Sequence, residues 1–492
     1  MPVDLISEPR FREADLGLPM PDDLHAVSAC LPLWRHNIGY EEGDLQVHSK
    51  LQAAYPRFCF HPIVQQLCDR FFNVDGRKGL PFASKQAAER AVEYVRHAVS
   101  AAATLQKLPG QSICGVTVEA DHFPVLKQYW QHAGENASSR VAELILNDCP
   151  ATCSDTEQRR AVRQRVAGFQ ATPLDDVFLF PSGMASIASA IRAVRQFRTG
   201  PICQFGFPYV DTLKILQRFP NTSHHFFPLG SAADLQKLTE LCQSTPPIAV
   251  VCEVPTNPLL VTPDMAALRS LADQYGFVLI VDDTLTACGN LNLTPFADLR
   301  VTSLTKYFSG YGNVLAGALT LNPGGSHYAD LRAAVTEEFE ETLSDIDVQV
   351  LAENSADMQQ RVRTINDNAV RLASFLRDHP QVQSVFYPSA DCREYEALRA
   401  AAGGYGGLMS IVLRDAERTT PIMFDSLEVC KGPNLGTNFT LCCPYTILAH
   451  YTELDFAETC GVSRWLLRIS VGTEPYDVLE RRFRTALDQA AD

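Results

Sequence analysis

The clearest pattern along the chain is an alternation of short apolar runs with longer helical stretches, which begins at Asp175. The apolar runs cover residues 177–180, 202–205, 248–253, 278–281 and 315–321, and the Ala- and Ile-rich stretch 185–197 separates the first two. Short apolar runs bounded by turn residues are typical of strands that are buried on both faces. Their alternation with helices predicts βαβ units and a mainly parallel sheet, so we expect an α/β fold.

The chain on either side of this region follows other patterns. Before about residue 165, helical stretches such as 84–102 lie among Pro-containing breaks. After about residue 345, a polar helix at 357–378, strands near 384–387 and 408–413, and a closing helix from Tyr476 predict an α+β unit. Because 492 residues are too many for one core, we expect three parts, at residues 1–165, 166–345 and 346–492.

Composition and charge narrow the classes of function. The formal net charge is −15 and no basic run appears, which argues against a nucleic-acid partner. No run approaches the ~18 apolar residues of a membrane span, and residues 1–15 mix Glu, Asp and Arg. The 15 cysteines include no C-x-x-C pair, so we expect reduced thiols and no metal site. These features predict a cytoplasmic protein without nucleic-acid or membrane partners.

Two segments of the predicted sheet carry candidate chemistry. Asp282 ends the run 278–281, which places a carboxylate at the carboxyl end of a buried strand, where open α/β sheets bind ligands. Ser303, Thr305 and Lys306 follow a second short strand. A carboxylate suits a pyridinium counter-ion, an amine suits a Schiff base, and hydroxyls suit a phosphate. Although either group alone is more often structural or exposed, together they predict a pyridoxal-phosphate (PLP) site.

Three more segments follow predicted strands and support this hypothesis. Ser182-Gly183-Met184 lies between a strand and a helix, where free N–H groups and the helix dipole can bind a phosphate. Tyr209 follows the next strand and can stack on a flat heterocycle. The prolines of P-T-N-P at 255–258 fix an extended loop that aims Asn257 at the same edge. Each is ordinary in isolation, but five strand ends that converge on one edge favour a ligand site.

In this order, the motifs resemble those of the Cys/Met-metabolism PLP enzymes, the fold-type I family of cystathionine γ-synthase, cystathionine lyases, methionine γ-lyase and homoserine sulfhydrylases. The family patterns are S-G-M-x-(A/S)-I, P-T-N-P-L, V-D-(D/N)-T, T-K-Y and R-(L/I)-S-V-G. They match residues 182–187, 255–259, 281–284, 305–307 and 468–472, and the likeness covers about residues 166–492. The phrases at 36–43, 206–209 and 435–440, with the long amino-terminal region, are most similar to the fungal type of cystathionine γ-synthase or a specialised-metabolism relative.

The resemblance implies both an architecture and a set of partners. It implies a fold-type I PLP-dependent transferase with a PLP-binding large domain at 166–345 and an α+β small domain at 346–492. Residues 1–165 are then an N-terminal extension and intersubunit arm. The implied cofactor is pyridoxal 5'-phosphate, the implied substrate is a small amino acid, and the implied assembly is a homodimer or homotetramer.

A role for each matching residue also follows from the resemblance. Lys306 is implied to form the Schiff base and to shuttle protons, and Asp282 to pair with the pyridinium nitrogen. Tyr209 is implied to stack on the ring and assist proton transfer, while Asn257 bonds the ring hydroxyl. The other implied cofactor contacts, mainly to the phosphate, are Gly183, Met184, Thr284, Ser303 and Thr305. Arg468 is implied to clamp the substrate α-carboxylate, because its guanidinium can bind a carboxylate through two parallel bonds.

Three positions depart from the family pattern. Asn434 begins the segment that reads S-L-G-G in the family, so we expect it to contact the substrate and change its fit. Tyr311-Gly312 stands where relatives carry a polar pair. The family's Y-x-R arginine, which reaches the phosphate of a neighbouring subunit, has no match at its usual distance. Arg140 lies at a plausible distance and Tyr55-Pro56-Arg57 much farther upstream, so we expect Arg140 to complete the site.

These features leave three functional readings. The first is γ-replacement on an O-acyl-L-homoserine by the thiol of L-cysteine, with carbon–sulfur lyase activity as a side reaction. The second uses the same electrophile with a carbon nucleophile, such as a β-keto acid in a specialised pathway, because the departures at Asn434 and Tyr311-Gly312 suit a changed second substrate. The third is a catalytically silent subunit, which the intact Lys306, Asp282 and Arg468 disfavour.

Overall fold

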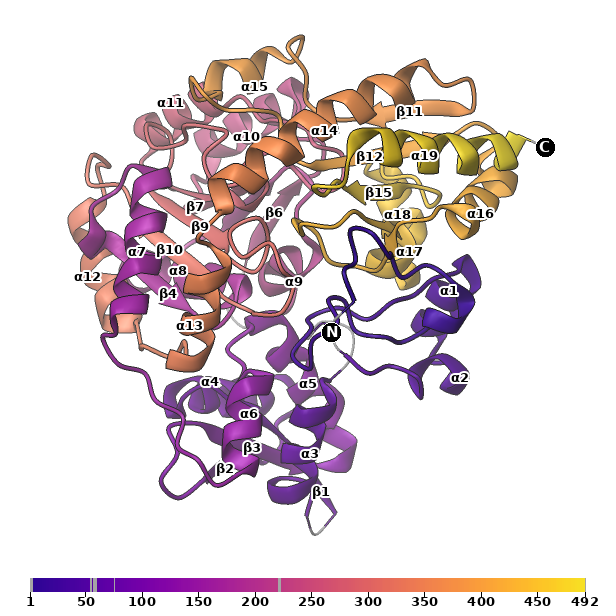
Figure 1. Cartoon of the computed structure of the whole chain (residues 1–492). Helices are drawn as coiled ribbons and strands as arrows, with labels where there is room; N and C mark the ends of the chain where they lie inside the picture. Colours follow the sequence, from indigo (N-terminus) through magenta and orange to yellow (C-terminus); the bar gives the residue numbers. More distant parts are fainter. Residues whose placement is uncertain (1–2, 54, 56–59, 75, 220–222, 492) are drawn as a thin grey trace.

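The computed structural model describes residues 3–53, 55, 60–74, 76–219 and 223–491, and over these residues the strands form three sheets (Figure 1). The largest sheet has seven strands in the order β4-β10-β9-β8-β7-β5-β6. Their bounds are β4 (Val177–Phe180), β5 (Ile202–Phe205), β6 (His224–Phe227), β7 (Ala249–Glu253), β8 (Val278–Asp282), β9 (Leu299–Ser303) and β10 (Gly317–Leu321). β10 is antiparallel to both of its neighbours, β4 and β9, and the other strand pairs of this sheet are parallel. The predicted mainly parallel α/β sheet is therefore confirmed.

Helices cover both faces of this sheet, and β8 shows why its sequence is apolar throughout. Val278 and Ile280 pack on one side with residues of α8, whereas Leu279 and Val281 pack on the other side with residues of α11. Alternate side chains of a strand point to opposite faces, so a strand covered on both sides is continuously apolar. The helices of this part are α7 (Glu157–Gln170), α8 (Gly183–Phe197), α9 (Val210–Arg218), α10 (Ala232–Ser244), α11 (Met265–Tyr275), α12 (Tyr328–Glu338) and α13 (Asp345–Asn354).

The carboxyl-terminal part is built on a five-stranded sheet in the order β11-β12-β15-β14-β13. Its strands are β11 (Val382–Phe386), β12 (Leu408–Leu413), β13 (Cys430–Lys431), β14 (Leu441–Pro444) and β15 (Leu467–Ser470). Its helices are α14 (Met358–Asp378), α15 (Arg393–Leu398), α16 (Ala416–Ser426), α17 (Tyr445–His450), α18 (Leu454–Thr459) and α19 (Tyr476–Ala491). The helices predicted at 357–378 and from Tyr476 agree with α14 and α19 within one residue at their starts.

The amino-terminal part contains a sheet that the sequence analysis did not predict. Three antiparallel strands, β1 (Arg77–Phe82), β2 (Thr104–Lys107) and β3 (Cys114–Glu119), pair in the order β1-β3-β2. They pack with α3 (Pro62–Phe71), α4 (Lys85–Val99), α5 (Phe123–Ala133) and α6 (Ser139–Leu146) around a separate apolar core. The helix predicted at 84–102 ends earlier, because Ser100 adopts a left-handed conformation with φ 51°.

The first residues of the chain lie beside the carboxyl-terminal part, as the indigo and yellow segments of Figure 1 show. This arm carries α1 (Trp34–Glu42) and α2 (Leu45–His48). Trp34 packs against Phe424 and Trp465, and its backbone N–H donates to Asp425 Oδ1 at 2.6 Å. Short 3-10 turns occur at Glu13–Asp15, Ala120–His122, Leu174–Asp176, Thr284–Thr286 and Tyr451–Glu453.

Candidate active site

One pocket lies at the carboxyl ends of the parallel strands. The predicted site residues that line it are Arg140, Gly183, Met184, Tyr209, Asn257, Asp282, Thr284, Ser303, Thr305, Lys306 and Arg468. They follow β4, β5, β7, β8 and β9 of the large sheet, together with β15 and the amino-terminal part. Asn434 stands between Pro433 and Leu435, which line the pocket, and contacts Lys306 directly. The predicted residues therefore come together in space from all three parts of the chain.

Lys306 lies in the tight turn after β9 and is 7% exposed. Its Nζ donates to Tyr55 Oη at 2.9 Å and to Asn434 Oδ1 at 2.6 Å. Gly436 crosses directly over this turn, where a Cβ atom would lie 2.6 Å from Tyr307 N, so only glycine fits there. Burial lowers the pKa of the Lys306 amine. A larger fraction of the amine is therefore neutral near pH 7 than for an exposed lysine.

Tyr55 lies at the site, although the sequence pattern favoured Arg140 over the Tyr55-Pro56-Arg57 segment. Burial raises the pKa of its hydroxyl, but the positive charge of Lys306 and hydrogen bonds from Lys306 and Tyr209 outweigh burial, so the pKa is below its ordinary value. The Y-x-R motif at residues 55–57 was the sequence signal for Tyr55, but its long distance upstream of Gly183 argued against a place in the site. Pro56 and Arg57 lie outside the described residues.

Two carboxyl groups lie side by side at the ends of β7 and β8, because Glu253 and Asp282 are partners in the parallel register. Burial raises the pKa of Asp282, and hydrogen bonds from Thr284 oppose the rise. Burial also raises the pKa of Glu253 well above its ordinary value, and the charge of Asp282 adds to the rise. Glu253 Oε2 accepts the Tyr209 N–H at 2.7 Å, so it fixes the turn that carries Tyr209.

Arg468 on β15 is a buried cation held by neutral groups. Its Nη1 donates to Asn257 Oδ1 at 3.2 Å, its Nη2 donates to the Pro433 carbonyl at 2.6 Å, and its guanidinium lies over the Tyr445 ring at 4.8 Å. No carboxylate of the described residues forms an ion pair with it, although it is only 5% exposed. A buried charge without a counter-ion is costly, so the site favours an anionic group at this position.

The first turn of α8 forms the other end of the pocket. Ser182 caps the helix by accepting the Ala185 N–H at 3.1 Å. A Cβ atom at Gly183 would lie 2.8 Å from Ser303 Cβ, so glycine allows the helix start to approach the turn after β9. The first N–H groups of a helix have no partner within it and attract anions. Thr284 Oγ1 accepts the Ser303 N–H at 2.8 Å and joins this end to the Asp282 strand.

Arg140 lines the same end of the pocket, from the first turn of α6. Its Nη1 donates to the Asn313 carbonyl at 2.7 Å and lies 3.4 Å from Asp347 Oδ1. It is 6% exposed. Arg140 thus lies in the pocket of its own chain, whereas the resemblance implies an arginine from a neighbouring subunit, and its role in cofactor binding stays a prediction.

The departures from the family pattern meet behind Lys306. A Cβ atom at Gly312 would lie 3.4 Å from Asn434 Nδ2, and the Gly312 carbonyl accepts the Val27 N–H of the amino-terminal arm at 2.9 Å. Asn434 Nδ2 is buried and makes no hydrogen bond within the described part of the chain. The Tyr311 ring faces another way and stacks on the Arg361 guanidinium at 5.4 Å. The two departures that lie beside one another near Lys306 are therefore Asn434 and Gly312.

Pyridoxal phosphate fits this set of residues. Burial raises the pKa of the Asp282 carboxyl group, and a protonated ring nitrogen beside it would supply a positive counter-charge. The start of α8, with Ser303 and Thr305, offers the N–H and hydroxyl groups that a phosphate needs. Lys306 supplies an amine of lowered pKa between these two ends. The Arg468 guanidinium remains for the carboxylate of an amino-acid substrate.

Comparison with protein families gives two matches along the chain. Residues 153–488 match the model described as "Cys/Met metabolism PLP-dependent enzyme". Residues 63–138 match "Fungal trans-sulfuration enzyme, N-terminal domain", the segment that contains the three-stranded sheet. Among the described residues, no helix is both long and apolar enough to cross a membrane.

Known proteins similar to the chain include enzymes of more than one reaction. The chain is 34% identical to a cystathionine gamma-synthase of Neurospora crassa, over 97% of this chain and 99% of that protein. It is 30% identical to an L-2-amino-4-chloropent-4-enoate dechlorinase/desaturase of Streptantibioticus cattleyicolor, over 96% of this chain and 98% of that protein. The structure resembles cystathionine gamma synthase from Xanthomonas oryzae, with a TM-score of 0.60 and 23% identity over 68% of this chain and 86% of that chain. This last likeness shows a shared fold.

Proposed function

The chain belongs to the Cys/Met metabolism PLP-dependent enzymes, and from this premise we propose that it catalyses γ-replacement on an O-acyl-L-homoserine with L-cysteine as the nucleophile. Its cofactor is pyridoxal 5'-phosphate, and its activity is of the cystathionine γ-synthase-like kind on small amino-acid substrates. The acyl-homoserine and the cysteine are the proposed part.

The observation that carries the proposal is the environment of Arg468. A buried guanidinium held by Asn257, the Pro433 carbonyl and the Tyr445 ring is already oriented before a substrate arrives. A substrate α-carboxylate supplies the missing counter-ion through charge-assisted hydrogen bonds. Binding there leaves the side chain of the amino acid to extend toward Lys306 and the two tyrosines, which is where a γ-leaving group needs acid–base assistance.

The residues around Lys306 can move the protons that this reaction requires. When bound, the cofactor supplies an electron sink for negative charge at the substrate Cα. The Lys306 amine, with its lowered pKa, can take a proton from one substrate carbon and return it to another. Tyr55, within 2.9 Å of Nζ, exchanges a proton with this amine, and Tyr209 hydrogen-bonds to Tyr55. The Asp282 carboxylate keeps the ring nitrogen protonated, which favours loss of the Cα proton.

A competition assay tests the proposed substrates. Purified protein with bound cofactor is incubated with O-acetyl-L-homoserine, L-cysteine and a β-keto acid in one vessel, and the product masses are recorded. We expect acetate release together with cystathionine as the main product. Acetate release with a carbon-linked product would establish the alternative, and no release of the acyl group as its carboxylate from any O-acyl-L-homoserine would overturn the proposal.

The alternative function uses a carbon nucleophile, and one observation favours it. Asn434 Nδ2 is a buried donor without a hydrogen-bond partner in the described residues, and it lies beside the small Gly312. A buried amide that lacks a partner is costly, so an acceptor on a second substrate that reached Asn434 between Pro433 and Leu435 would stabilise it. A β-keto acid carries two acceptors, its ketone and its carboxylate. The electrophile, the cofactor and the role of Lys306 are the same in both functions.

Asn434→Ser is expected to change the choice of nucleophile. Serine cannot present both an acceptor to Lys306 and a separate N–H donor at this distance. We expect the ratio of cysteine-derived to β-keto-acid-derived product to change by about tenfold or more, the ~1.4 kcal/mol of one hydrogen bond. The competition assay measures this ratio directly.

The matched control is Asn438→Ser, the same replacement in the same loop. Asn438 is held by its backbone N–H, which donates to the Gly310 carbonyl at 2.7 Å. We expect the product ratio to stay at the parent value in this variant. An equal ratio in parent and Asn434→Ser would mean that Asn434 is only a packing change.

The proposed assembly is a homodimer or homotetramer. Closed symmetric assemblies are the common case for soluble enzymes, and the family resemblance implies that an arginine of a neighbouring subunit completes each phosphate site. Light scattering of the active protein should give at least twice the mass of one chain, which is 54.3 kDa. A fully active species of the single-chain mass would contradict this proposal.

A further inference from the structure

The amino-terminal part of the chain contacts the first turn of α8 directly. Ser182 Oγ donates to the Gly134 carbonyl at 2.7 Å. Gly134 has φ +67°, and a Cβ atom there would lie 2.4 Å from Ser182 Oγ and 2.6 Å from Met184 Cβ. Only glycine allows this approach. The segment after α5 therefore presses against the turn that carries Gly183 and Met184, at the phosphate end of the pocket.

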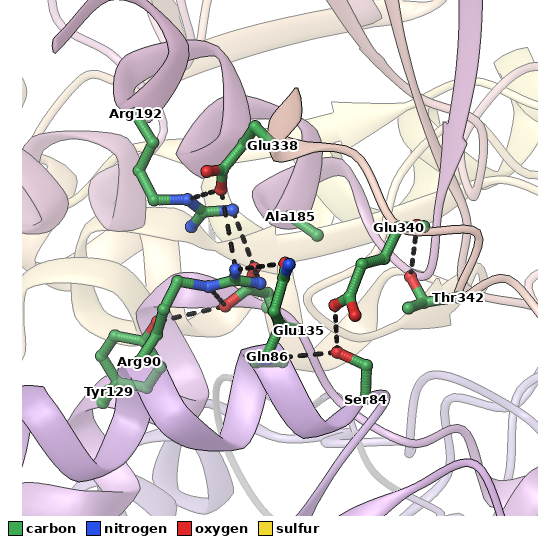
Figure 2. Close-up of polar contacts among 12 residues, drawn as sticks. Ser84, Gln86, Arg90, Tyr129, Glu135, Ala185, Arg192, Glu338, Glu340 and Thr342 are labelled. Carbon is green, nitrogen blue, oxygen red and sulfur yellow. Dashed lines mark hydrogen bonds and ion pairs between the residues drawn. The ribbon is translucent and has the colours of Figure 1, made fainter. Parts of the chain in front are cut away.

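The next residue, Glu135, anchors this segment in a network of buried charges (Figure 2). Its Oε1 accepts from Arg90 Nη2 at 2.5 Å and from Arg192 Nη2 at 2.8 Å. Its Oε2 accepts from the Tyr129 hydroxyl at 3.1 Å. Arg192 belongs to α8, and its Nε also donates to Glu338 at the end of α12. Glu135 thus joins α4 and α5 of the amino-terminal part to the body of α8.

The network is balanced in charge and mostly buried, although the side chains of Arg90 and Arg192 are 21% and 24% exposed. Arg90 and Arg192 face Glu135 and Glu338, and the Glu135 side chain is 7% exposed. Burial raises the pKa of Glu135, but the charges of Arg192 and Arg90 outweigh burial and hold the pKa below its ordinary value. A buried ion pair adds little net stability because desolvation offsets the attraction. Removing one partner, however, leaves a buried charge uncompensated, so the network strongly disfavours any other placement of α8.

We propose that the amino-terminal part acts as a cofactor clamp, and that Glu135 is the residue that positions the first turn of α8 for the cofactor phosphate. Gly134 sets the distance between the two parts, and the bond from Arg192 to Glu135 fixes the axial position of the helix. The amino-terminal part is a folded unit, yet it supplies few of the groups near Lys306. The clamp gives this unit a function. It rests on the shown cofactor and does not depend on which nucleophile is used.

The test compares two aldehydes that differ only in the phosphate. Apoprotein carrying Glu135→Gln is titrated with pyridoxal 5'-phosphate and with pyridoxal, and binding is followed by visible absorption. We expect the affinity for pyridoxal 5'-phosphate to fall by about tenfold or more, because Arg192 keeps Glu338 but loses its ionic link to the segment after α5, so the helix start is no longer held against that segment. The affinity for pyridoxal should change less than about twofold, because pyridoxal makes no phosphate contact.

Glu340→Gln is the matched control. Glu340 accepts a hydrogen bond from Ser84 and joins the same two parts of the chain (Figure 2), but among the described residues it forms no hydrogen bond or ion pair with α8. We expect both affinities to match the parent in this variant. If Glu135→Gln weakens both aldehydes equally, or neither, the clamp is overturned.

Two further measurements test the clamp if Glu135→Gln does not fold. Arg192→Gln breaks the same contact from the α8 side and should give the same selective loss. Hydrogen exchange of the unaltered protein needs no variant. Adding pyridoxal 5'-phosphate should slow exchange in residues 129–135 as well as at the start of α8. Slowing that is confined to α8 would contradict the proposal.

Discussion

Lys306→Ala is expected to abolish γ-replacement and to remove the visible absorption of the bound cofactor. Lys306 carries the only amine among the described residues that line the pocket. Its loss removes both the covalent attachment and the proton carrier, so we expect the rate to fall by about 10⁴-fold or more, ~5 kcal/mol of barrier. Absorption spectra after dialysis and the rate of acetate release measure the two effects.

Lys431→Met is the control for this change. Lys431 is also fully buried, and burial lowers its pKa to about 8. Its Nζ bonds the Phe424 and Asp425 carbonyls at the end of α16, away from the pocket. We expect a lower melting temperature with the cofactor absorption retained. Absorption that survives dialysis in Lys306→Ala would remove Lys306 from its proposed role.

Asp282→Ala is expected to slow loss of the Cα proton by about two to four orders of magnitude, ~3–5 kcal/mol. Without the carboxylate, the ring nitrogen loses the buried counter-charge that keeps its proton. Glu253 lies next to Asp282 in register, but its Oε2 accepts the Tyr209 N–H, and burial, the larger cause of its raised pKa, persists in the variant, so Glu253 is a poor replacement for the lost carboxylate. Exchange of the substrate Cα proton in D₂O, followed by NMR, measures this step.

Asp283→Asn separates this effect from a general loss of structure. Asp283 is the next residue, it is buried on the other side of the strand, and it accepts from Gln170 Nε2 at 2.8 Å and from Thr302. Burial raises its pKa to about 6. We expect a less stable protein whose Cα exchange stays within a few-fold of the parent. Equal exchange rates in Asp282→Ala and the parent would place Asp282 outside the site.

Local sequence signals predicted most of the large sheet, and the residues predicted to bind the cofactor lie together in one pocket. Each predicted strand there is a short apolar run buried on both faces, so burial leaves a mark in the sequence itself. Asp282, Tyr209 and Asn257 follow such runs directly, and parallel strands bring their carboxyl ends to one edge. Position along a strand was therefore enough to bring these side chains together.

The three-stranded sheet of the amino-terminal part could not be predicted in the same way. β1 contains Gly79 and Pro81, residues that argue against a strand, and β2 is short and half exposed. β3 pairs with β1 and β2, and α4 and its flanking loops separate β1 from the other two strands in the sequence. Tertiary packing, and not local propensity, decides such strands.

The contacts of Tyr55 and Asn434 with Lys306 were also beyond reach from the sequence. Tyr55 is 251 positions from Lys306, and Asn434 is 128 positions away. Both contacts depend on how the amino-terminal and carboxyl-terminal parts pack on the large sheet. A motif indicates which side chains lie at the end of its own strand, whereas Tyr55 and Asn434 belong to other parts of the fold.

The reaction in D₂O tests the central claim most directly. Holoenzyme is given O-acetyl-L-homoserine and L-cysteine in D₂O, and the position of deuterium in the product is determined by NMR. Once Lys306 has taken a proton, its ammonium holds three equivalent hydrogens, most of them from solvent, so a returned hydrogen is mostly deuterium. The account predicts cystathionine with deuterium at both Cα and Cβ of the homoserine-derived half. Cystathionine without deuterium at Cβ, as direct displacement at Cγ would give, would contradict it.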